Sequence, residues 1–299
     1  MQEPRTIIFV PGKNPKPPPE LHREQLLRCL IAGVGRIDPA IAREIAEYPD
    51  VFRLVSWNHV YYHDELPGIP DPEWIDALIE KPGPTDEDRR ELTSPRRRAA
   101  RWVYRFVDSF PKVLSLFPDS HLRDTIEEVD RYFENHEGIA KQVRALLKDD
   151  LHEKFDTGSR VMLMAHSLGS VIAYDALWEL THLNHKPDWL DAFVSMGSPL
   201  GSRYVQRRIC GAQDKGTRRY PHNIHHWYNV SAIGDLTAAD PHLSNDFKPM
   251  VKLGLLKELK DVHDAWNWYR NARGINPHRC YGYMICPQVA QLVVDWWRA

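Results

Sequence analysis

One serine of the chain stands in a sequence context that can turn a weak hydroxyl into a nucleophile. Ser167 is the centre of Ala165-His-Ser-Leu-Gly169, a small-x-Ser-x-Gly pattern. A catalytic serine of this kind sits on a tight strand-to-helix turn, which exposes its hydroxyl at the top of a sheet. The residues two before and two after it must be small, because strand and helix nearly touch there. Ala165 and Gly169 meet this requirement, with alanine in place of the more usual first glycine.

The chain around Ser167 has the patterns that such a turn requires. An apolar run at residues 160–165 predicts a fully buried strand, and the spacing of Val171, Ile172 and Leu177 predicts a helix over 170–180. A pattern this short often arises by chance. The strand before it and the helix after it make it specific, so we interpret Ser167 as a nucleophile rather than as a serine in an ordinary turn.

Strand and helix patterns alternate along the rest of the chain. Short β-branched or apolar runs predict further strands at 6–10, 51–55, 192–196, 223–230 and 261–269. Helical spacing predicts helices at 21–47, split after Gly35, at 121–150, which Gly138 can break, and at 287–297. Strands that alternate with helices indicate a parallel sheet with helices on both faces, that is, an α/β fold.

Residues 58–118 differ in character from the rest of the chain. They are rich in Pro, Asp, Glu and Arg, and helical spacing predicts short helices at 73–80 and 96–109. We interpret 58–118 as an inserted helical cap or lid, and residues 1–57 and 119–299 as the core domain.

Four aromatic residues follow the second predicted strand: Trp57, His59, Tyr61 and Tyr62. Ligands of open α/β sheets bind outside the carboxyl ends of the strands. These side chains are therefore candidates for a pocket or a cap hinge, and packing in the core explains them equally well.

Together these pieces resemble the α/β-hydrolase superfamily, most closely its compact lipase- and esterase-like members. The matching motifs are Phe9-Val-Pro-Gly12, Ala165-His-Ser-Leu-Gly169 and Ser195-Met-Gly-Ser-Pro199, with the segments around Asp235 and His278. In larger members two antiparallel strands come before the strand of the oxyanion loop, whereas here that strand is the first one. The resemblance therefore implies an α/β-hydrolase fold with about six mainly parallel strands.

The resemblance also implies which carboxylate completes the site. Acyl transfer through serine needs a general base, and a carboxylate must orient that base. The family's order along the chain is serine, then acid, then histidine. Asp235 follows the strand predicted at 223–230 and is the implied acid, with Asp240 and Asp246 as alternatives.

The implied base is His278, which precedes the helix predicted at 287–297. In relatives an aromatic residue often follows the catalytic histidine within a few residues, and Tyr281 fits that pattern. His263 is the rival, and we interpret it as a strand residue.

The oxyanion that forms when serine attacks a carbonyl needs two preorganised N–H donors. The resemblance implies the backbone N–H of Leu168, directly after the nucleophile, as the first donor. The second is implied just after Pro11-Gly12, at Lys13. Relatives have His-Gly at this position, so the proline is a departure that leaves Asn14 open as the donor.

Composition excludes several classes of protein. The chain has 39 Lys+Arg against 41 Asp+Glu, a formal charge of -2, which argues against a general nucleic-acid binder. Its 42% apolar and 27% charged residues are those of an ordinary globular chain. No window reaches the ~20 apolar residues of a transmembrane segment, and no signal peptide comes before the first strand.

Cysteine and histidine spacing gives no sign of a metal. The four cysteines form no CxxC pair, so they indicate neither a zinc site nor a redox motif. They look like reduced thiols of a cytoplasmic protein, although a disulfide between Cys280 and Cys286 stays open. The cluster of His222, His225 and His226 lacks a carboxylate or cysteine partner at metal-site spacing. We expect no metal and no cofactor.

The sequence thus predicts a serine hydrolase that cleaves a small-molecule or lipid carboxylic ester through an acyl-enzyme. Thioester hydrolysis or acyl transfer on the same triad is the enzymatic alternative. A non-catalytic binding protein of the same fold is the alternative of another class, since a fold alone never proves a function.

Overall fold

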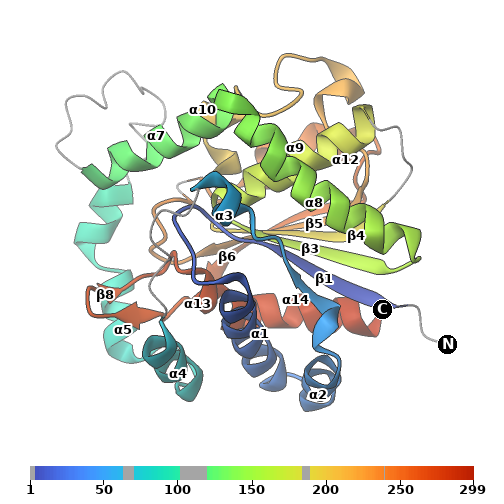
Figure 1. Cartoon of the computed structure of the whole chain (residues 1–299). Coiled ribbons are helices and arrows are strands. Elements are labelled where there is room, and N and C mark those ends of the chain that lie inside the picture. Colours follow the sequence, from blue (N-terminus) through green and yellow to red (C-terminus); the bar gives the residue numbers. More distant parts are fainter. Residues whose placement is uncertain (1–3, 63–70, 102–119, 184–188, 239) are drawn as a thin grey trace.

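The computed structural model of the 299-residue chain describes residues 4–62, 71–101, 120–183, 189–238 and 240–299. For residues 120–126 it describes the backbone alone. At its centre lies a six-stranded sheet with the order β2-β1-β3-β4-β5-β6, in which every pair of neighbours is parallel (Figure 1). The strands are β1 (Arg5–Val10), β2 (Phe52–Leu54), β3 (Arg160–His166), β4 (Leu190–Met196), β5 (Ile224–Ala232) and β6 (Glu258–Ala265).

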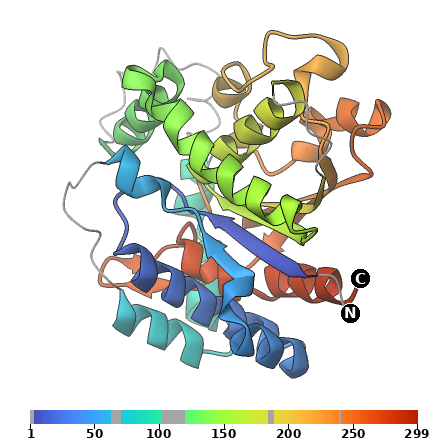
Figure 2. The same ribbon diagram turned by 45° about the vertical axis from the view of Figure 1, so that its right-hand side comes forward.

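Helices cover both faces of the sheet, because successive strand residues point to opposite sides and both sides are apolar. In β1, Ile8 and Val10 belong to one buried cluster, and Ile7 and Phe9 belong to the other. Figures 1 and 2 show the two helix layers from different sides.

The first cluster includes residues of α3 (Trp57–Tyr61), α7 (Ser120–Glu134), α8 (Ile139–Asp156), α9 (Leu168–His182), α10 (Arg203–Gln206), α11 (Leu243–Asp246) and α12 (Lys248–Lys252). The second includes residues of α1 (Pro19–Gly35), α2 (Pro39–Glu47), α4 (Pro72–Glu80), α13 (Cys280–Ile285) and α14 (Pro287–Arg298). The remaining elements are α5 (Asp86–Leu92), the two-stranded sheet of β7 (Arg270–Asn271) and β8 (Gly274–Ile275), and 3₁₀ helices at Pro49–Val51, His136–Gly138, Pro199–Gly201 and Gly216–Arg219.

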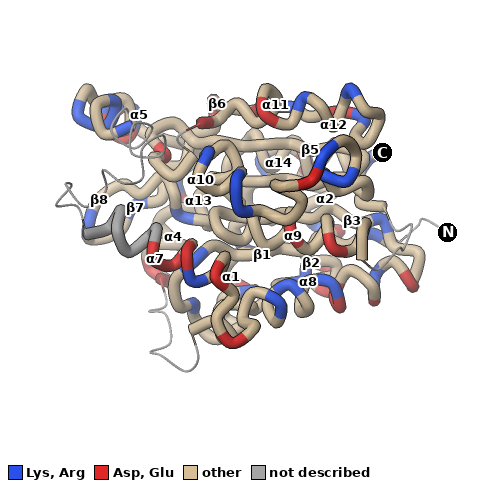
Figure 3. Tube along the Cα trace, turned by 90° about the horizontal axis from the view of Figure 1, so that it is seen from above, with Lys and Arg blue, Asp and Glu red and all other residues tan. Residues whose placement is uncertain are grey.

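Charged residues lie mainly on the outer helices and loops and on the edge strand β6, and the inner strands carry few of them (Figure 3). This distribution is the one expected for a parallel sheet buried on both faces. The expectation of about six parallel strands between helices is confirmed.

Both expected breaks in the helices are confirmed, and each has a local cause. α1 ends at Gly35, and the carboxylate of Asp38 then caps α2 by accepting from the backbone N–H groups of Ala40 and Ile41, at 2.9 and 3.2 Å. The break between α7 and α8 lies at Asn135, Glu137 and Gly138, whose φ angles of 50°, 52° and 76° do not fit a right-handed helix.

The bounds predicted for the last strand, 261–269, are wrong at both ends. β6 spans Glu258–Ala265 and its pattern is exposed, because it is the edge of the sheet. After Ala265 the chain leaves the sheet, and Trp268 and Tyr269 are buried in the second cluster instead. The aromatic residues that made this segment resemble a strand therefore pack against helices.

The described parts of residues 58–118 pack on the core. α4 matches the helix predicted at 73–80, and it places Ile75 and Leu78 in the second cluster. Further along, the guanidinium of Arg97 donates to the carbonyl oxygens of Gly234, at 3.5 Å, and Ile275, at 3.0 Å. The helix predicted at 96–109 lies outside the described residues beyond Arg101. The cap stays a prediction.

All four cysteines are free, so the disulfide left open between Cys280 and Cys286 is not formed. Within the described ranges, we find no helix that combines the length and the apolar character needed to cross a membrane.

Candidate active site

The strand-to-helix turn expected at Ser167 is present. β3 ends at His166 and α9 begins at Leu168, so Ser167 alone makes the turn. Its φ of 53° and ψ of -128° lie where residues other than glycine are rarely found, at a cost of order 1–3 kcal/mol. The Ser167 backbone N–H donates to the carbonyl oxygen of Met196 at 3.0 Å, which ties the strained turn to β4. This is the geometry of a nucleophile elbow.

Two glycines are required by the close approach of three segments at this turn. A Cβ on Gly169 would collide with the carbonyl oxygens of Val10 and Pro11 at the end of β1. A Cβ on Gly12 would lie 2.7 Å from His166 Nδ1 and 2.9 Å from Ser167 Cβ. The loop after β1 can therefore lie directly beside the serine only because both positions lack a side chain.

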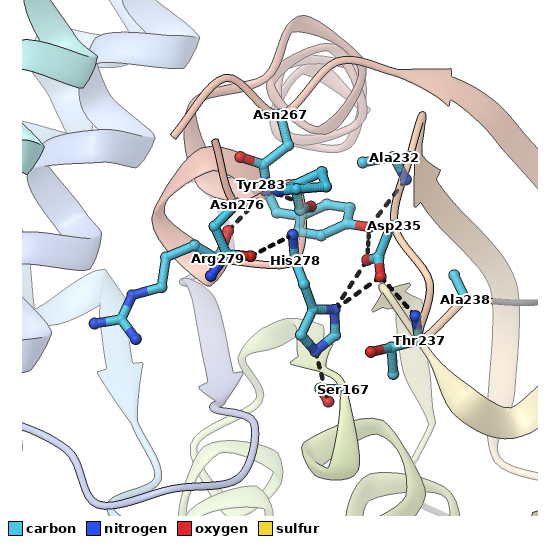
Figure 4. Close-up of polar contacts among 12 residues, drawn as sticks. Ser167, Ala232, Asp235, Thr237, Ala238, Asn267, Asn276, His278, Arg279 and Tyr283 are labelled. Atoms are coloured by element: carbon cyan, nitrogen blue, oxygen red, sulfur yellow. Dashed lines mark hydrogen bonds and ion pairs between the residues drawn. The ribbon is translucent and has the colours of Figure 1, made fainter. Parts of the chain in front are cut away.

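The structure brings His278 to the serine. Its Nε2 lies 3.0 Å from Ser167 Oγ, although the two residues are far apart in the chain (Figure 4). The loop that carries His278 is held at two points. The His278 backbone N–H donates to Asn276 Oδ1 at 3.0 Å, and the Asn267 amide donates to the carbonyl oxygens of Pro277 and Arg279, both at 2.8 Å.

Asp235 lies on the far side of the imidazole. His278 Nδ1 is 2.9 Å from Asp235 Oδ2 and 3.1 Å from Oδ1, and the carboxylate is buried (Figure 4). Burial alone would raise the pKa of Asp235, but the charge of His278 and the hydrogen bonds from His278, Tyr283 and Thr237 outweigh it, so the pKa is lowered. Asp235 is therefore ionised at neutral pH and holds Nδ1–H of His278 toward itself.

The alternatives that the sequence left open lie elsewhere. Asp240 Oδ1 accepts from the backbone N–H of His242 at 3.2 Å, and Asp246 ends α11. His263 lies on β6 as interpreted, with its ring centroid 4.8 Å from that of His242. None of the three contacts Ser167 in the described part of the chain.

Tyr283 of α13 is a part of the site that the sequence reasoning missed. Its hydroxyl donates to Asp235 Oδ2 at 2.6 Å and accepts from the backbone N–H of Ala232 at 2.9 Å (Figure 4). Burial, together with the charge of Asp235, raises the pKa of Tyr283 well above its ordinary value, so the phenol stays a donor. Tyr281, which the family pattern pointed to, donates to Gln25 Oε1 at 2.7 Å instead.

We expect Tyr283→Phe to lower kcat for ester hydrolysis about 10-fold, the usual effect of removing one hydrogen bond to a buried charge. KM should change little, because the phenol touches Asp235 and not the substrate. Tyr281→Phe is the matched control, because Tyr281 donates to Gln25 and not to Asp235. An equal loss of kcat in that variant would refute the role of Tyr283.

The two backbone donors expected for an oxyanion lie on either side of Ser167. Leu168 is the first residue of α9, where a backbone N–H has no partner within the helix. Among the described residues we find no hydrogen-bond partner for the backbone N–H of Leu168 or of Lys13. The N–H of Asn14 donates to Tyr62 Oη at 2.8 Å, so of the two candidates in this loop Lys13 has the available donor.

The aromatic residues after β2 hold the loop that carries Lys13. Trp57 Nε1–H donates to the carbonyl oxygen of Pro11 at 2.8 Å, and the Asn58 amide donates to the carbonyl oxygens of Gly12, at 2.8 Å, and Asn14, at 3.0 Å. Side chains thus fix successive carbonyl groups of the loop, which orients the N–H groups between them. Sequence reasoning left this role of Trp57 and Tyr62 open and did not find Asn58.

His166, the residue before Ser167, packs on the imidazole of His278. Its ring centroid lies 4.6 Å from that of His278, and the side chain is buried. Burial and the charge of His278 lower the pKa of His166 well below its ordinary value, so its ring is neutral.

The histidine cluster predicted not to bind metal lies apart from the triad. His222 Nε2 is 2.7 Å from the carbonyl oxygen of Thr217, and the ring of His225 stacks on Trp189. In the part of the chain that the structure describes, we find no group of three or more His, Cys, Asp or Glu residues that could hold a metal ion.

Comparison with known proteins adds no relative: no family model, curated protein or solved structure matches the chain.

Proposed function

We propose that this protein is a serine hydrolase of the α/β-hydrolase type that cleaves a carboxylic ester. The observation that carries the proposal is the continuous chain of contacts from Ser167 Oγ to His278 Nε2, at 3.0 Å, and from His278 Nδ1 to Asp235, at 2.9 Å. Nucleophile, base and orienting acid within hydrogen-bond distance of one another are the signature of nucleophilic acyl transfer. The strained turn at Ser167 supports the same reading, because strain of this kind concentrates at functional sites.

Acylation follows from these contacts. Asp235 fixes the tautomer in which Nδ1 of His278 carries the proton and Nε2 is free to accept one. As Ser167 Oγ attacks the ester carbonyl, its proton passes to Nε2, and the imidazolium is stabilised by the buried carboxylate. The same proton then goes to the leaving alcohol oxygen, so the C–O bond of the ester breaks and an acyl-serine remains.

The negative charge of each tetrahedral intermediate falls on the former carbonyl oxygen. The N–H groups of Leu168 and Lys13 are the donors we assign to it, and the N-terminus of α9 adds a favourable dipole. Water then attacks the acyl-serine and gives a proton to Nε2 of His278. The acyl C–Oγ bond breaks, Oγ of Ser167 takes that proton from Nε2, and the carboxylic acid is released.

A chain-length series of 4-nitrophenyl esters tests the proposal and sorts short esters from lipid-like ones. We expect hydrolysis by the native chain, with a burst of nitrophenol equal to the enzyme concentration wherever deacylation is slower than acylation. A Ser167→Ala chain that releases nitrophenol as fast as the native chain would refute the proposal and leave the binding protein as the better reading.

A further inference from the structure

Basic side chains gather next to the triad. Lys13 and Lys16 lie on the loop after β1, and Arg279 directly follows His278. Two of these three cations have carboxylate partners. Lys13 Nζ lies 2.8 Å from Glu128 Oε2, and the guanidinium of Arg279 is paired with Asp71.

Lys16 is the cation in excess. Its half-buried ammonium donates to the carbonyl oxygen of Lys13 at 2.5 Å, and no carboxylate of the described residues lies within ion-pair distance of it. An ammonium group has three donors, so at least part of its hydrogen-bonding capacity is unused. Burial is the main cause that lowers the pKa of Lys16 to about 8; the charges of Arg279 and Lys13 add to it, and that of Glu128 opposes it. A positive charge in this position is costly until an anion accompanies it.

Two further polar atoms near Lys16 have no partner among the described residues. They are Nε2 of His22, which is 2% exposed, and Nε of Arg279. Burial, followed by the charges of Lys16 and Arg279, lowers the pKa of His22 well below its ordinary value. The His22 ring is therefore neutral, and its Nε2 is free to form a hydrogen bond with a ligand. The Lys16 ammonium and the Nε–H of Arg279 are donors that lack acceptors, and an anionic oxygen group would supply them.

This basic cluster lies close to the triad, although the guanidinium of Arg279 itself points away from Ser167 (Figure 4). The charges of Lys16 and Arg279 both act on His166, and the ring of His166 packs against that of His278. Lys16 is also tied to the carbonyl group of Lys13, the residue whose N–H we assign to the oxyanion. One substrate molecule could therefore contact both Lys16 and Ser167.

We propose that Lys16 binds an anionic oxygen group of the substrate, so that the preferred substrate is an ester carrying a carboxylate or phosphate near its scissile bond. The proposal depends on the function proposed above. We assign the anion to the substrate because Lys16 lies on the same loop as Lys13, whose backbone N–H we assign to the oxyanion.

Matched pairs of esters test this preference. The carboxylate pair is mono(4-nitrophenyl) glutarate and 4-nitrophenyl butyrate, and the phosphate pair is 1-butyrylglycerol 3-phosphate and 1-butyrylglycerol. For each pair the readout is the ratio of kcat/KM for the anionic ester to that for the neutral ester. This ratio is insensitive to a loss of activity that a substitution in the loop causes equally for both esters.

We expect the native ratio to exceed 1 for at least one pair, and Lys16→Gln to lower that ratio about 10- to 100-fold. Lys16→Arg keeps the charge and should retain most of the preference, and Lys252→Gln on the exposed part of α12 is the control. The native ratio should also fall as the pH rises through about 8, because the free ammonium then loses its proton. The pair that responds identifies the anion as carboxylate or phosphate.

The outcomes separate the two proposals. Native hydrolysis of neutral esters with a ratio that Lys16→Gln does not change would overturn the role of Lys16 and leave the hydrolase standing. Hydrolysis of all four esters no faster than by Ser167→Ala would overturn the hydrolase, and the inference with it.

Discussion

Replacing His278 by alanine should lower kcat for a 4-nitrophenyl ester by about 10⁶-fold, the scale of losing the base of a serine triad. The reason is geometric. Nε2 of His278 is the group of the described chain that lies 3.0 Å from Ser167 Oγ, and without it the hydroxyl keeps its proton at neutral pH. The measurement is kcat from steady-state nitrophenol release, with purified protein at high concentration to reach the residual rate.

His263→Ala is the matched control, because His263 lies on the edge strand β6 and packs against His242. It should keep near-native kcat. The double variant Ser167→Ala with His278→Ala should be no slower than either single variant, because the two residues act as one unit. Full activity in His278→Ala would remove this histidine from the mechanism.

Asp235→Asn should lower kcat about 10⁴-fold while the fold is kept. An asparagine fits the same space, and its oxygen can still accept from the Thr237 N–H, which now donates to Asp235 Oδ1 at 2.9 Å. Its amide N–H₂ would face Nδ1 of His278, so the imidazole would carry its proton on Nε2. In that tautomer the base cannot accept the proton of Ser167.

No other base is expected to replace His278 in Asp235→Asn. Its kcat should therefore stay low and change little between pH 6 and pH 9. Asp240→Asn is the control, because Asp240 was the sequence's alternative acid and contacts His242 instead. An equal loss in both variants, with Asp235→Asn still folded by circular dichroism, would show that the acid is misassigned.

Fold class was readable from the sequence because its signals are local. Fully buried parallel strands are continuous apolar runs, and β3, from Arg160 to His166, is such a run. The bounds of the last strand were predicted wrongly because Trp268 and Tyr269 are aromatic residues of the kind common in strands. In the structure they pack in the second cluster with the helices. The spacing of apolar residues does not show whether an aromatic residue packs in a sheet or against a helix. The bounds of an edge strand such as β6 are therefore difficult to predict from the sequence.

The mutual contacts of Ser167, His278 and Asp235 could be predicted because two constraints on these residues are visible in the chain. The turn at Ser167 needs small neighbours, and the resemblance supplied the order in which acid and base follow. The sequence did not predict side chains that contact the site from distant segments of the chain. Tyr283 meets Asp235 only because α13 turns back toward the end of β5, and Asn58 meets Gly12 only through the pairing of β1 with β2.

Gly197 shows how closely the triad is enclosed. It has a φ of 54°, and a Cβ there would lie 2.8 Å from Asp235 Oδ2 and 3.1 Å from both His278 Nδ1 and Tyr283 Oη. Sequence reasoning gave the Gly-Ser-Pro loop after β4 as part of the family resemblance. Its physical role, making room for the acid and the base, became visible only with the side chains in place.

The most direct test of the central claim is covalent labelling by a fluorophosphonate, followed by mass spectrometry of the digested chain to locate the adduct. The probe reacts with a serine that a neighbouring base activates, whatever the natural substrate is. We predict one adduct on the native chain, at Ser167, with no label on Ser167→Ala and much slower labelling of His278→Ala. Labelling of Ser167→Ala at the native rate, or no reaction of the native chain, would contradict the account.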